Sequence, residues 1–141
     1  MTNYLITGAG RGIGLEMTKQ ALAAGHSVIG SVRPGADAAL LDLATDSGGS
    51  LGIITFDVRQ PETIAAAATA LDRPIDVLVN NAGIIGHQPQ STSDMDFDGF
   101  SDTLAVNTLG PLRVVHAFLP HLRRGNRPRI VTISSKMGSF S

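Results

Sequence analysis

The chain has 141 residues, of which 43% are hydrophobic and 16% charged, with a formal net charge of −1. This length predicts one domain, and this composition indicates a compact folded chain rather than a disordered one. The lysines and arginines are scattered, which excludes a broad basic face for nucleic acid or an anionic membrane. Small molecules or proteins are therefore the expected partners.

Cysteine is absent from the sequence, which excludes a disulfide framework, a thiolate nucleophile and a zinc site with cysteine ligands. The N-terminus lacks the basic flank and long apolar run of a signal peptide. No run reaches the ~18 apolar residues of a membrane span. We expect a soluble, cytoplasmic protein.

Short β-branched runs alternate with longer helical stretches along the chain. Strands are predicted at residues 4–7, 27–32, 51–56, 76–79 and 129–134. Helices are predicted at residues 13–24, 36–45, 61–71 and 98–122. This alternation predicts right-handed βαβ units. The expected fold class is α/β, a doubly wound parallel sheet of the Rossmann type with five strands, in a single domain over residues 1–141.

The glycine-rich stretch after the first predicted strand is the most informative segment. It runs Thr7-Gly8-Ala9-Gly10-Arg11-Gly12-Ile13-Gly14, directly before a predicted helix. A helix N-terminus offers unpaired N–H groups and a positive dipole to a pyrophosphate, and glycines let the backbone approach it closely. The spacing is Gly-x-x-x-Gly-x-Gly rather than G-x-G-x-x-G, because Ile13 stands where the third glycine of that pattern would fall. A tight turn without a ligand is the alternative.

Polar side chains follow the third and fourth predicted strands. Asp57 is placed to accept from an exocyclic amine, or else to cap the following turn. Asn80 and Asn81 either face a ligand or serve only as turn residues that tolerate left-handed backbone, with Gly83 supplying the positive φ. Ligands of open α/β sheets bind outside the carboxyl ends of the strands, where the strand order reverses. We therefore expect these positions to lie close together.

Asn107 lies in the longest predicted helix, four residues before Pro111. Because proline has no N–H, the Asn107 carbonyl loses its helical partner. We expect a kink and a free acceptor there. A plain proline kink without function is the alternative.

These motifs resemble those of the short-chain dehydrogenase/reductase family, over residues 4–135. Thr7, Gly8, Gly12 and Gly14 match its Thr-Gly-x-x-x-Gly-x-Gly motif, Asp57-Val58 its adenine contact, and Asn80-Asn81-Ala82-Gly83 its Asn-Asn-Ala-Gly motif. Asn107 and the second serine of Ile133-Ser134-Ser135 match its catalytic Asn and Ser. The resemblance implies an NAD(P)-binding domain whose cofactor residues are Thr7, Gly8, Gly10, Arg11, Gly12, Ile13, Gly14, Arg33, Asp57, Val58, Asn81, Ala82 and Gly83, with catalytic residues Asn107 and Ser135.

Two arginines favour NADP(H) over NAD(H). NAD sites place a carboxylate at the end of the second strand, whereas residues 28–33 contain no Asp or Glu and end in Arg33. Arg11 stands where NADP(H)-preferring members often carry a basic residue, and a guanidinium pairs bidentately with phosphate. The alternative is a pair of solvated surface arginines.

The resemblance implies an oxidoreductase that transfers a hydride between NADP(H) and a carbonyl or alcohol substrate. In the family, the Ser orients and polarises the substrate, the Asn holds a relay water, and a Tyr-x-x-x-Lys pair about a dozen residues beyond the Ser transfers the proton. Here the only tyrosine is Tyr4 and the nearest lysine is Lys136. We therefore expect a C-terminally truncated member, inactive on its own. The alternative is a non-catalytic NAD(P)-binding module or sensor.

No metal site is predicted from the sequence. His116 and His121 are five residues apart, not the three or four that share a helix face. Four aspartates read as N-terminal helix charges, namely Asp94, Asp96, Asp98 and Asp102. The resemblance further implies a homodimer or homotetramer of the full-length form, through the helix at 98–122.

Overall fold

The computed structural model describes residues 1–35 and 38–138. Its main sheet has the strand order β3-β2-β1-β4-β7, and every neighbouring pair is parallel. The strands are β1 Asn3–Thr7, β2 Ser27–Val32, β3 Leu51–Thr55, β4 Val77–Asn80 and β7 Arg129–Thr132. The predicted doubly wound parallel sheet is confirmed.

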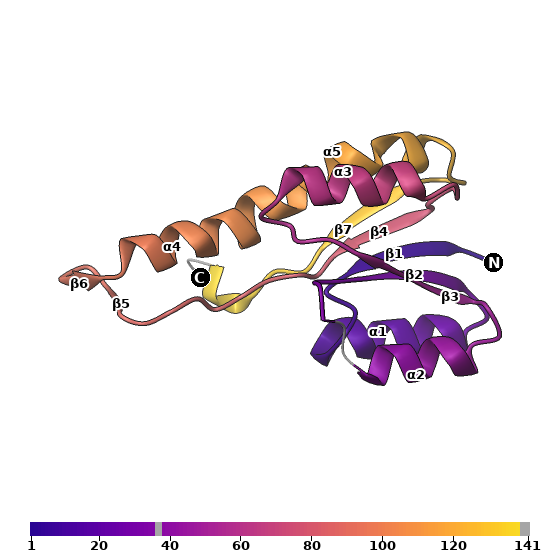
Figure 1. The fold of residues 1–141 in the computed structure, drawn as a ribbon, viewed down its shortest axis with the longest axis horizontal. Helices are drawn as coiled ribbons and strands as arrows, with labels where there is room; N and C mark the ends of the chain where they lie inside the picture. Colours follow the sequence, from indigo (N-terminus) through magenta and orange to yellow (C-terminus); the bar gives the residue numbers. More distant parts are fainter. Residues whose placement is uncertain (36–37, 139–141) are drawn as a thin grey trace.

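Helices cover both faces of this sheet (Figure 1). The helices on one face are α1 Gly12–Ala23 and α2 Ala38–Asp46, and those on the other are α3 Pro61–Ala70 and α5 Gly110–Arg123. The predicted elements are all found, with most bounds shifted by one or two residues. The first two residues of the helix predicted at 36–45 lie outside the described residues.

The helix predicted at 98–122 is not one regular helix. It consists of α4 Phe97–Leu104, a π-helical turn at Ala105–Leu109 and then α5. Pro111, at the start of α5, cannot donate to the carbonyl four residues back, and the wider π pattern occurs where the α ladder is interrupted. The interruption around Asn107 was predicted correctly, but its form is a π turn within a continuous helical path.

A small hairpin precedes α4 and was not predicted. Its strands are β5 Gln90–Ser91 and β6 Asp94–Met95, and Figure 1 shows hairpin and α4 extending beyond the end of the sheet. Asp96 caps α4 by accepting from the Gly99 N–H at 3.0 Å, and Asp98 lies in the first turn. Asp94 belongs to β6 and Asp102 to the body of α4, so the reading of all four aspartates as N-terminal helix charges is wrong for these two.

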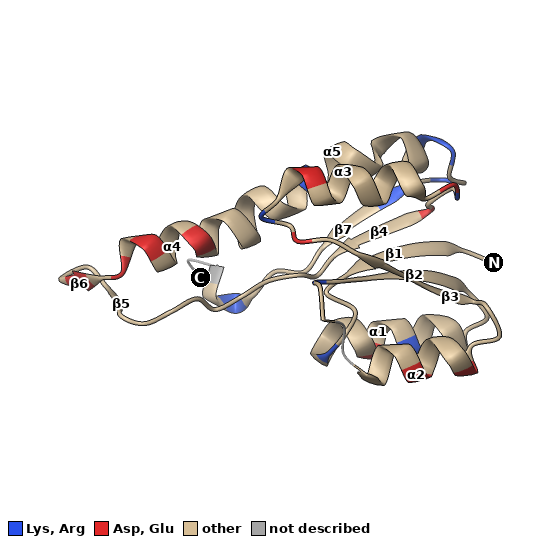
Figure 2. Cartoon of the chain, viewed as in Figure 1, with Lys and Arg blue, Asp and Glu red and all other residues tan. Residues whose placement is uncertain are grey.

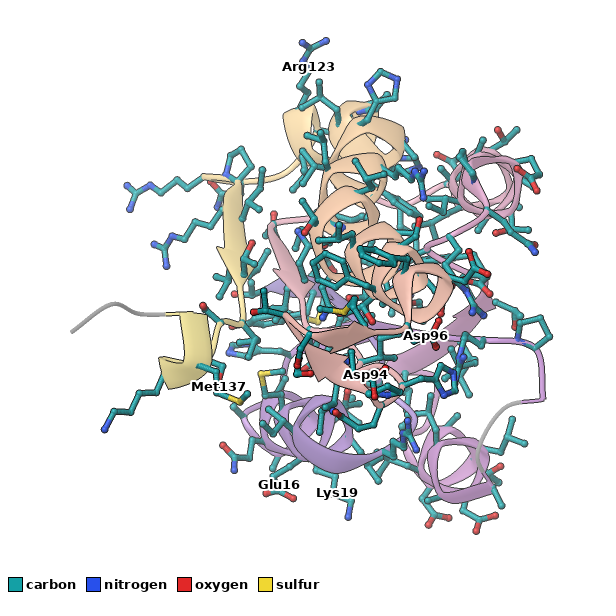
Figure 3. The ribbon with its side chains drawn as sticks, turned by 90° about the vertical axis from the view of Figure 1, so that its left-hand side faces the viewer. Glu16, Lys19, Asp94, Asp96, Arg123 and Met137 are labelled. Carbon is teal, nitrogen blue, oxygen red and sulfur yellow. The ribbon has the colours of Figure 1, made fainter. Side chains whose placement is uncertain are left out.

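Two apolar clusters form the core, one on each face of the sheet. Successive residues of β1 serve both, since Leu5 belongs to the cluster under α3 and α5 and Ile6 to the cluster over α1 and α2. Such two-sided burial explains why neighbouring residues of β1 are both apolar instead of alternating with polar ones. On α1, Gly14 and Thr18 are buried against the sheet, whereas Glu16 and Lys19 point away from it (Figure 3). Within residues 1–35 and 38–138, every helix is too short or too polar to cross a bilayer.

Candidate functional site

A cavity of about 960 Å³ opens at the carboxyl ends of β1 to β4, beside the point where the strand order reverses between β1 and β4. This volume falls in the range of ligand sites, about 300–1,000 Å³. Most of the predicted cofactor residues line it together: Gly8, Gly10, Arg11, Gly12, Ile13, Arg33, Asp57, Val58, Asn81, Ala82 and Gly83. Thr7, Gly14, Asn107 and Ser135 do not line it.

Thr7 lies behind the cavity lining and supports the turn after β4. Its buried hydroxyl accepts from the backbone N–H groups of Asn81 and Ala82, both at 3.0 Å, and donates to the Val79 carbonyl at 3.4 Å. The Asn81 amide in turn donates to the carbonyls of Thr7 and Gly8 at 3.0 and 3.2 Å. The turn after β1 and the turn after β4 are therefore joined by hydrogen bonds that the chain itself completes.

The glycines of the first turn have separate structural reasons. A Cβ on Gly14 would overlap the Gly8 carbonyl oxygen, and it would lie 2.6 Å from Asn81 Nδ2. Gly8 has φ 66°, and a Cβ there would lie 3.0 Å from Ala82 Cα. Gly12 has φ 55° and open space around it. Glycine is therefore required at position 14, where α1 packs on the turn after β1 and on the Asn81 side chain, and at position 8, where that turn packs on the turn after β4.

The turn after β4 does not use left-handed backbone at the expected positions. Among the described residues, the one non-glycine with positive φ is Arg127, and the glycines with positive φ do not include Gly83. The alternative in which Asn80, Asn81 and Gly83 form a left-handed turn is therefore wrong. The physical reason is that Asn81 is held by side-chain hydrogen bonds to the β1 turn rather than by a turn of its own.

The N-terminus of α1 opens at this cavity. Arg11 is its N-cap residue and makes no capping hydrogen bond with its side chain. The first N–H groups of a helix have no partner within the helix, so the positive end of α1 is available to an anion among residues that line the cavity. Backbone donors, a close-packed glycine turn and two arginines fit the phosphates of a dinucleotide.

Asp57 is the centre of an ion-pair cluster at the end of β3. Its Oδ1 accepts from the Arg59 backbone N–H at 2.9 Å, and its Oδ2 lies 2.7 Å from Arg59 Nη2. Arg59 Nη1 also lies 3.3 Å from Asp102 Oδ1 on α4. The hydrogen bond from the Arg59 side chain holds the pKa of Asp57 below its usual range, aided by the charge of Arg33 and opposed by burial. The turn-capping alternative for Asp57 is therefore observed, in a residue that also lines the cavity.

The Asn107 side chain is hydrogen-bonded to the loop after β4. Its Nδ2 donates to the Ile84 carbonyl at 2.7 Å, and its Oδ1 accepts from the Ile84 N–H at 2.9 Å. Neighbouring Val106 lines the cavity, but Asn107 does not. The π turn thus holds the outgoing loop of β4 in place.

Ser135 follows β7, which continues the sheet through a hydrogen bond from the Ile133 N–H to the Asn80 carbonyl at 2.9 Å. Its Oγ accepts from the Met137 N–H at 3.2 Å, at a short 3-10 turn over Lys136–Gly138. Every residue of β7 is exposed, as is Ser135 itself. The structure therefore places Ser135 on the sheet edge outside the cavity lining.

Several cavity residues escaped the sequence prediction: Ser31, Val32, Pro34, Gly35, Phe56, Arg59, Ile84, Gly86, His87, Asp102 and Val106. Some of them flank Arg33 or Asp57, so their place at strand ends was a usable signal. Asp102 had no such signal, because it reaches the cavity through a contact with Arg59, 43 residues away. In the described parts of the chain, no three His, Cys, Asp or Glu side chains gather as metal ligands would.

The parallel sheet, its reversal point and the glycine turn define a doubly wound α/β protein. A family model described as short chain dehydrogenase matches residues 2–141. The chain therefore belongs to the short-chain dehydrogenase family.

Individual relatives agree with this assignment. The chain is 35% identical over 147 residues to a short-chain dehydrogenase of Pyricularia oryzae, covering 99% of this chain and 58% of that protein. It is 36% identical over 146 residues to estradiol 17-beta-dehydrogenase 1 of Rattus norvegicus, covering 97% and 42%. A crystal structure of a short-chain dehydrogenase/reductase from Burkholderia multivorans with bound NADP superposes with a TM-score of 0.89 at 36% identity, covering 99% of this chain and 61% of that one. The chain spans about half the length of the curated relatives it matches.

Proposed function

We propose that this chain binds NADP(H) in the cavity and serves an oxidoreductase that transfers a hydride between NADP(H) and a carbonyl or alcohol substrate. The observation that carries the proposal is the N-terminus of α1, which has no side-chain cap and packs closely at Gly14 on Gly8 and Asn81. Arg11 and Arg33 line the cavity beside it. The bound NADP of the Burkholderia multivorans relative supports the choice of cofactor.

Each part of the cavity has a proposed role in holding the cofactor. The backbone N–H groups at the start of α1 bind the pyrophosphate. Arg11 and Arg33 bind the 2′-phosphate, where an NAD site would carry a carboxylate. Asp57 and Val58 contact the adenine. From the adenine, the cofactor extends along Asn81, Ala82 and Gly83 towards the loop after β4, which the Asn107 side chain holds in place.

Two residues outside the cavity lining are proposed to act on the substrate. When bound, NADP(H) supplies or accepts the hydride. The Ser135 hydroxyl accepts from the Met137 N–H in this structure, so its own proton stays available to donate to a substrate oxygen. The Asn107 main-chain carbonyl is the proposed acceptor for a relay water, with the loop at Ile84 fixed by its side chain.

The cofactor proposal is tested by titrating the purified protein with NADPH and NADH and following ligand fluorescence. Hydrogen bonds to charged groups are worth about 1.5–3 kcal/mol, or roughly 10- to 100-fold in affinity. Arg33→Ala is therefore expected to weaken NADPH at least tenfold and to leave NADH within about twofold. Lys19→Ala, on the outer face of α1, is the control. Equal losses for both cofactors with Arg33→Ala, or no NADPH binding by the wild type, would refute the proposal.

A second candidate is cofactor binding without turnover, as in a sensor. It is favoured by the positions of Asn107 and Ser135, neither of which lines the cavity that most of the predicted cofactor residues line. The two candidates are separated by following NADPH oxidation at 340 nm with a panel of aldehydes and ketones. Turnover by the purified protein excludes the sensor, whereas tight binding without turnover favours it.

We propose that the protein self-associates through the helical stretch of α4 and α5. Large apolar side chains are exposed along it, including Phe97 at 76% and Leu112 at 66%. Sedimentation equilibrium is expected to show a dimer or tetramer that Leu112→Glu converts to monomer. The cytoplasmic location is likewise a proposal, and cell fractionation tests it.

A further inference from the structure

Arg59 lies where β3 stops and joins acidic side chains from two different elements. Its Nη2 and Nε lie 2.7 and 3.1 Å from Asp57 Oδ2, and its Nε lies 3.0 Å from Asp57 Oδ1. Its Nη1 lies 3.3 and 3.4 Å from the two carboxylate oxygens of Asp102. The side chain therefore bridges the turn after β3 and helix α4, and all three residues line the cavity.

The bridge fixes the Asp57 carboxylate without using all of its acceptor capacity. Three N–H groups of Arg59 donate to it: the backbone N–H to Oδ1, Nη2 to Oδ2, and Nε to both oxygens, at 3.0 and 3.1 Å. A carboxylate has about four lone-pair sites, so these three protons leave room for one more donor. The Asp57 side chain is 11% exposed. Bulk water therefore has little access to the remaining acceptor site. An amine of a ligand bound in the cavity can donate to it.

The backbone of the same turn is held independently. Arg113 Nη1, on α5, donates to the carbonyls of Val58 and Arg59 at 3.2 Å each. The path of the turn therefore has a second support when the Arg59 side chain is removed. What Arg59 adds is the orientation of the Asp57 carboxylate and a positive charge beside two negative ones.

We propose, resting on the function proposed above, that Arg59 is a positioning residue that orients Asp57 to accept from the 6-amino group of the adenine of NADP(H). Asp102 anchors the Arg59 guanidinium from α4. The arrangement selects adenine over a purine with a carbonyl at position 6, because that oxygen would meet the lone pair of Asp57 instead of offering a proton. Arg59 thus acts on base selectivity through Asp57, without a direct bond to the cofactor.

The test compares NADPH with its hypoxanthine analogue, which carries a carbonyl in place of the 6-amino group. Dissociation constants for both are measured on the wild type, Arg59→Met and Asp102→Asn. The matched control is Arg124→Met, which also removes an arginine paired with an aspartate, at 2.9 Å from Asp72, but in a pair whose side chains are 52% and 92% exposed. Circular dichroism checks the fold of each variant.

The wild type is expected to prefer NADPH by about tenfold or more, the value of one hydrogen bond to a charged group. Arg59→Met is expected to reduce this preference to less than about threefold, Asp102→Asn to an intermediate value, and Arg124→Met to leave it unchanged. If Arg59→Met does not fold, Asp102→Asn decides by whether the preference falls.

Three outcomes overturn the inference while leaving NADPH binding intact. These are a wild type without preference, variants that keep the wild-type preference, and variants that lose affinity for both nucleotides equally, as a purely structural clamp would. A wild type that binds neither nucleotide refutes the proposed function itself.

Discussion

The glycine-rich turn after β1 and the segment after β7 both carry predicted site residues, but the fold holds them in different ways. Thr7 is 1% exposed, and its hydroxyl and the Asn81 amide tie the turn to the end of β4. Ser135 is exposed, at the end of a strand that has β4 on one side and is exposed along its whole length. Figure 3 shows the neighbouring Met137 on a turn at the outside of the molecule.

This difference separates two kinds of site. The cofactor turn is built from backbone groups and close packing, so its geometry is part of the stability of the fold. The Ser135 segment contributes chemistry through one hydroxyl and little packing. Substitutions in the cofactor turn should therefore lower the free energy of unfolding, whereas substitutions in the Ser135 segment should mainly lower activity.

Gly14→Ala is expected to have the largest effect on the free energy of unfolding. The added methyl group would overlap the Gly8 carbonyl oxygen, and the strain should outweigh the ~1 kcal/mol that alanine gains over glycine within a helix. We expect a loss of about 3 kcal/mol in the free energy of unfolding, measured by urea denaturation, with loss of NADPH binding. Gly12→Ala is the control, because the space there is open and only its φ of 55° is unfavourable, at about 1 kcal/mol. Equal losses in both variants would contradict the packing argument.

Thr7→Val should have the next largest effect. Valine has the shape of threonine but leaves the N–H groups of Asn81 and Ala82 without their acceptor. We expect a loss of about 2 kcal/mol in the free energy of unfolding, since each unsatisfied buried donor costs about 1–3 kcal/mol. Thr7→Ser keeps the hydroxyl and should cost distinctly less. Similar losses for Val and Ser would show that the methyl group, not the hydrogen bonds, matters.

The Asp57–Arg59 pair should give a smaller, pH-dependent effect. Because the pKa of Asp57 is lowered in the folded state, the pair stabilises the protein above the pKa of an unfolded Asp, about 3.9. This stabilisation is lost as the pH falls through the lower folded value. With the Arg59 side chain 35% exposed, solvent screening limits the effect to about 1 kcal/mol. The stability difference between wild type and Arg59→Met should therefore be larger at pH 7 than at pH 3 in urea melts, and a difference independent of pH would contradict it.

Ser135→Ala is expected to change the free energy of unfolding least and to act on turnover instead. Within the described part of the chain, the Ser135 hydroxyl is hydrogen-bonded to the Met137 N–H alone, at an exposed turn. We expect a change below about 0.5 kcal/mol in the free energy of unfolding and unchanged NADPH affinity. Turnover, in a preparation with measurable activity, should fall about 100-fold or more. A large loss of stability would show that the segment belongs to the packed core.

Much of the fold could be predicted from local patterns. Short β-branched runs such as residues 27–32 indicated strands because β-branched side chains fit a pleated, buried surface, and every residue of β2 is buried. The glycine turn could be interpreted because backbone approach and helix start are properties of neighbouring residues. The hairpin over residues 90–95 escaped because it has two short strands without apolar alternation.

The parts that escaped prediction depend on residues distant along the chain. Asn107 was expected to act through its carbonyl, but its side chain closes a pair of hydrogen bonds with Ile84, 23 residues away. The bridge from Arg59 to α4 gave no signal in the sequence, because its second partner, Asp102, is 43 residues away. Figure 2 shows the acidic residues along α4, and only the packing of that helix brings one of them to the cavity.

By itself, the sequence determined the order of strands and helices along the chain, the glycine turn with Arg11 at the start of α1, and Arg33 at the end of β2. These features follow from the periodicity and backbone chemistry of residues close together in the sequence. They can therefore be predicted without knowing how the elements pack. Only the tertiary structure decided that Gly14 meets Gly8 and Asn81, that Arg59 joins Asp57 to Asp102, and that Ser135 stands apart from the cavity. Those contacts link separate elements, so their existence depends on how the sheet and its helices pack.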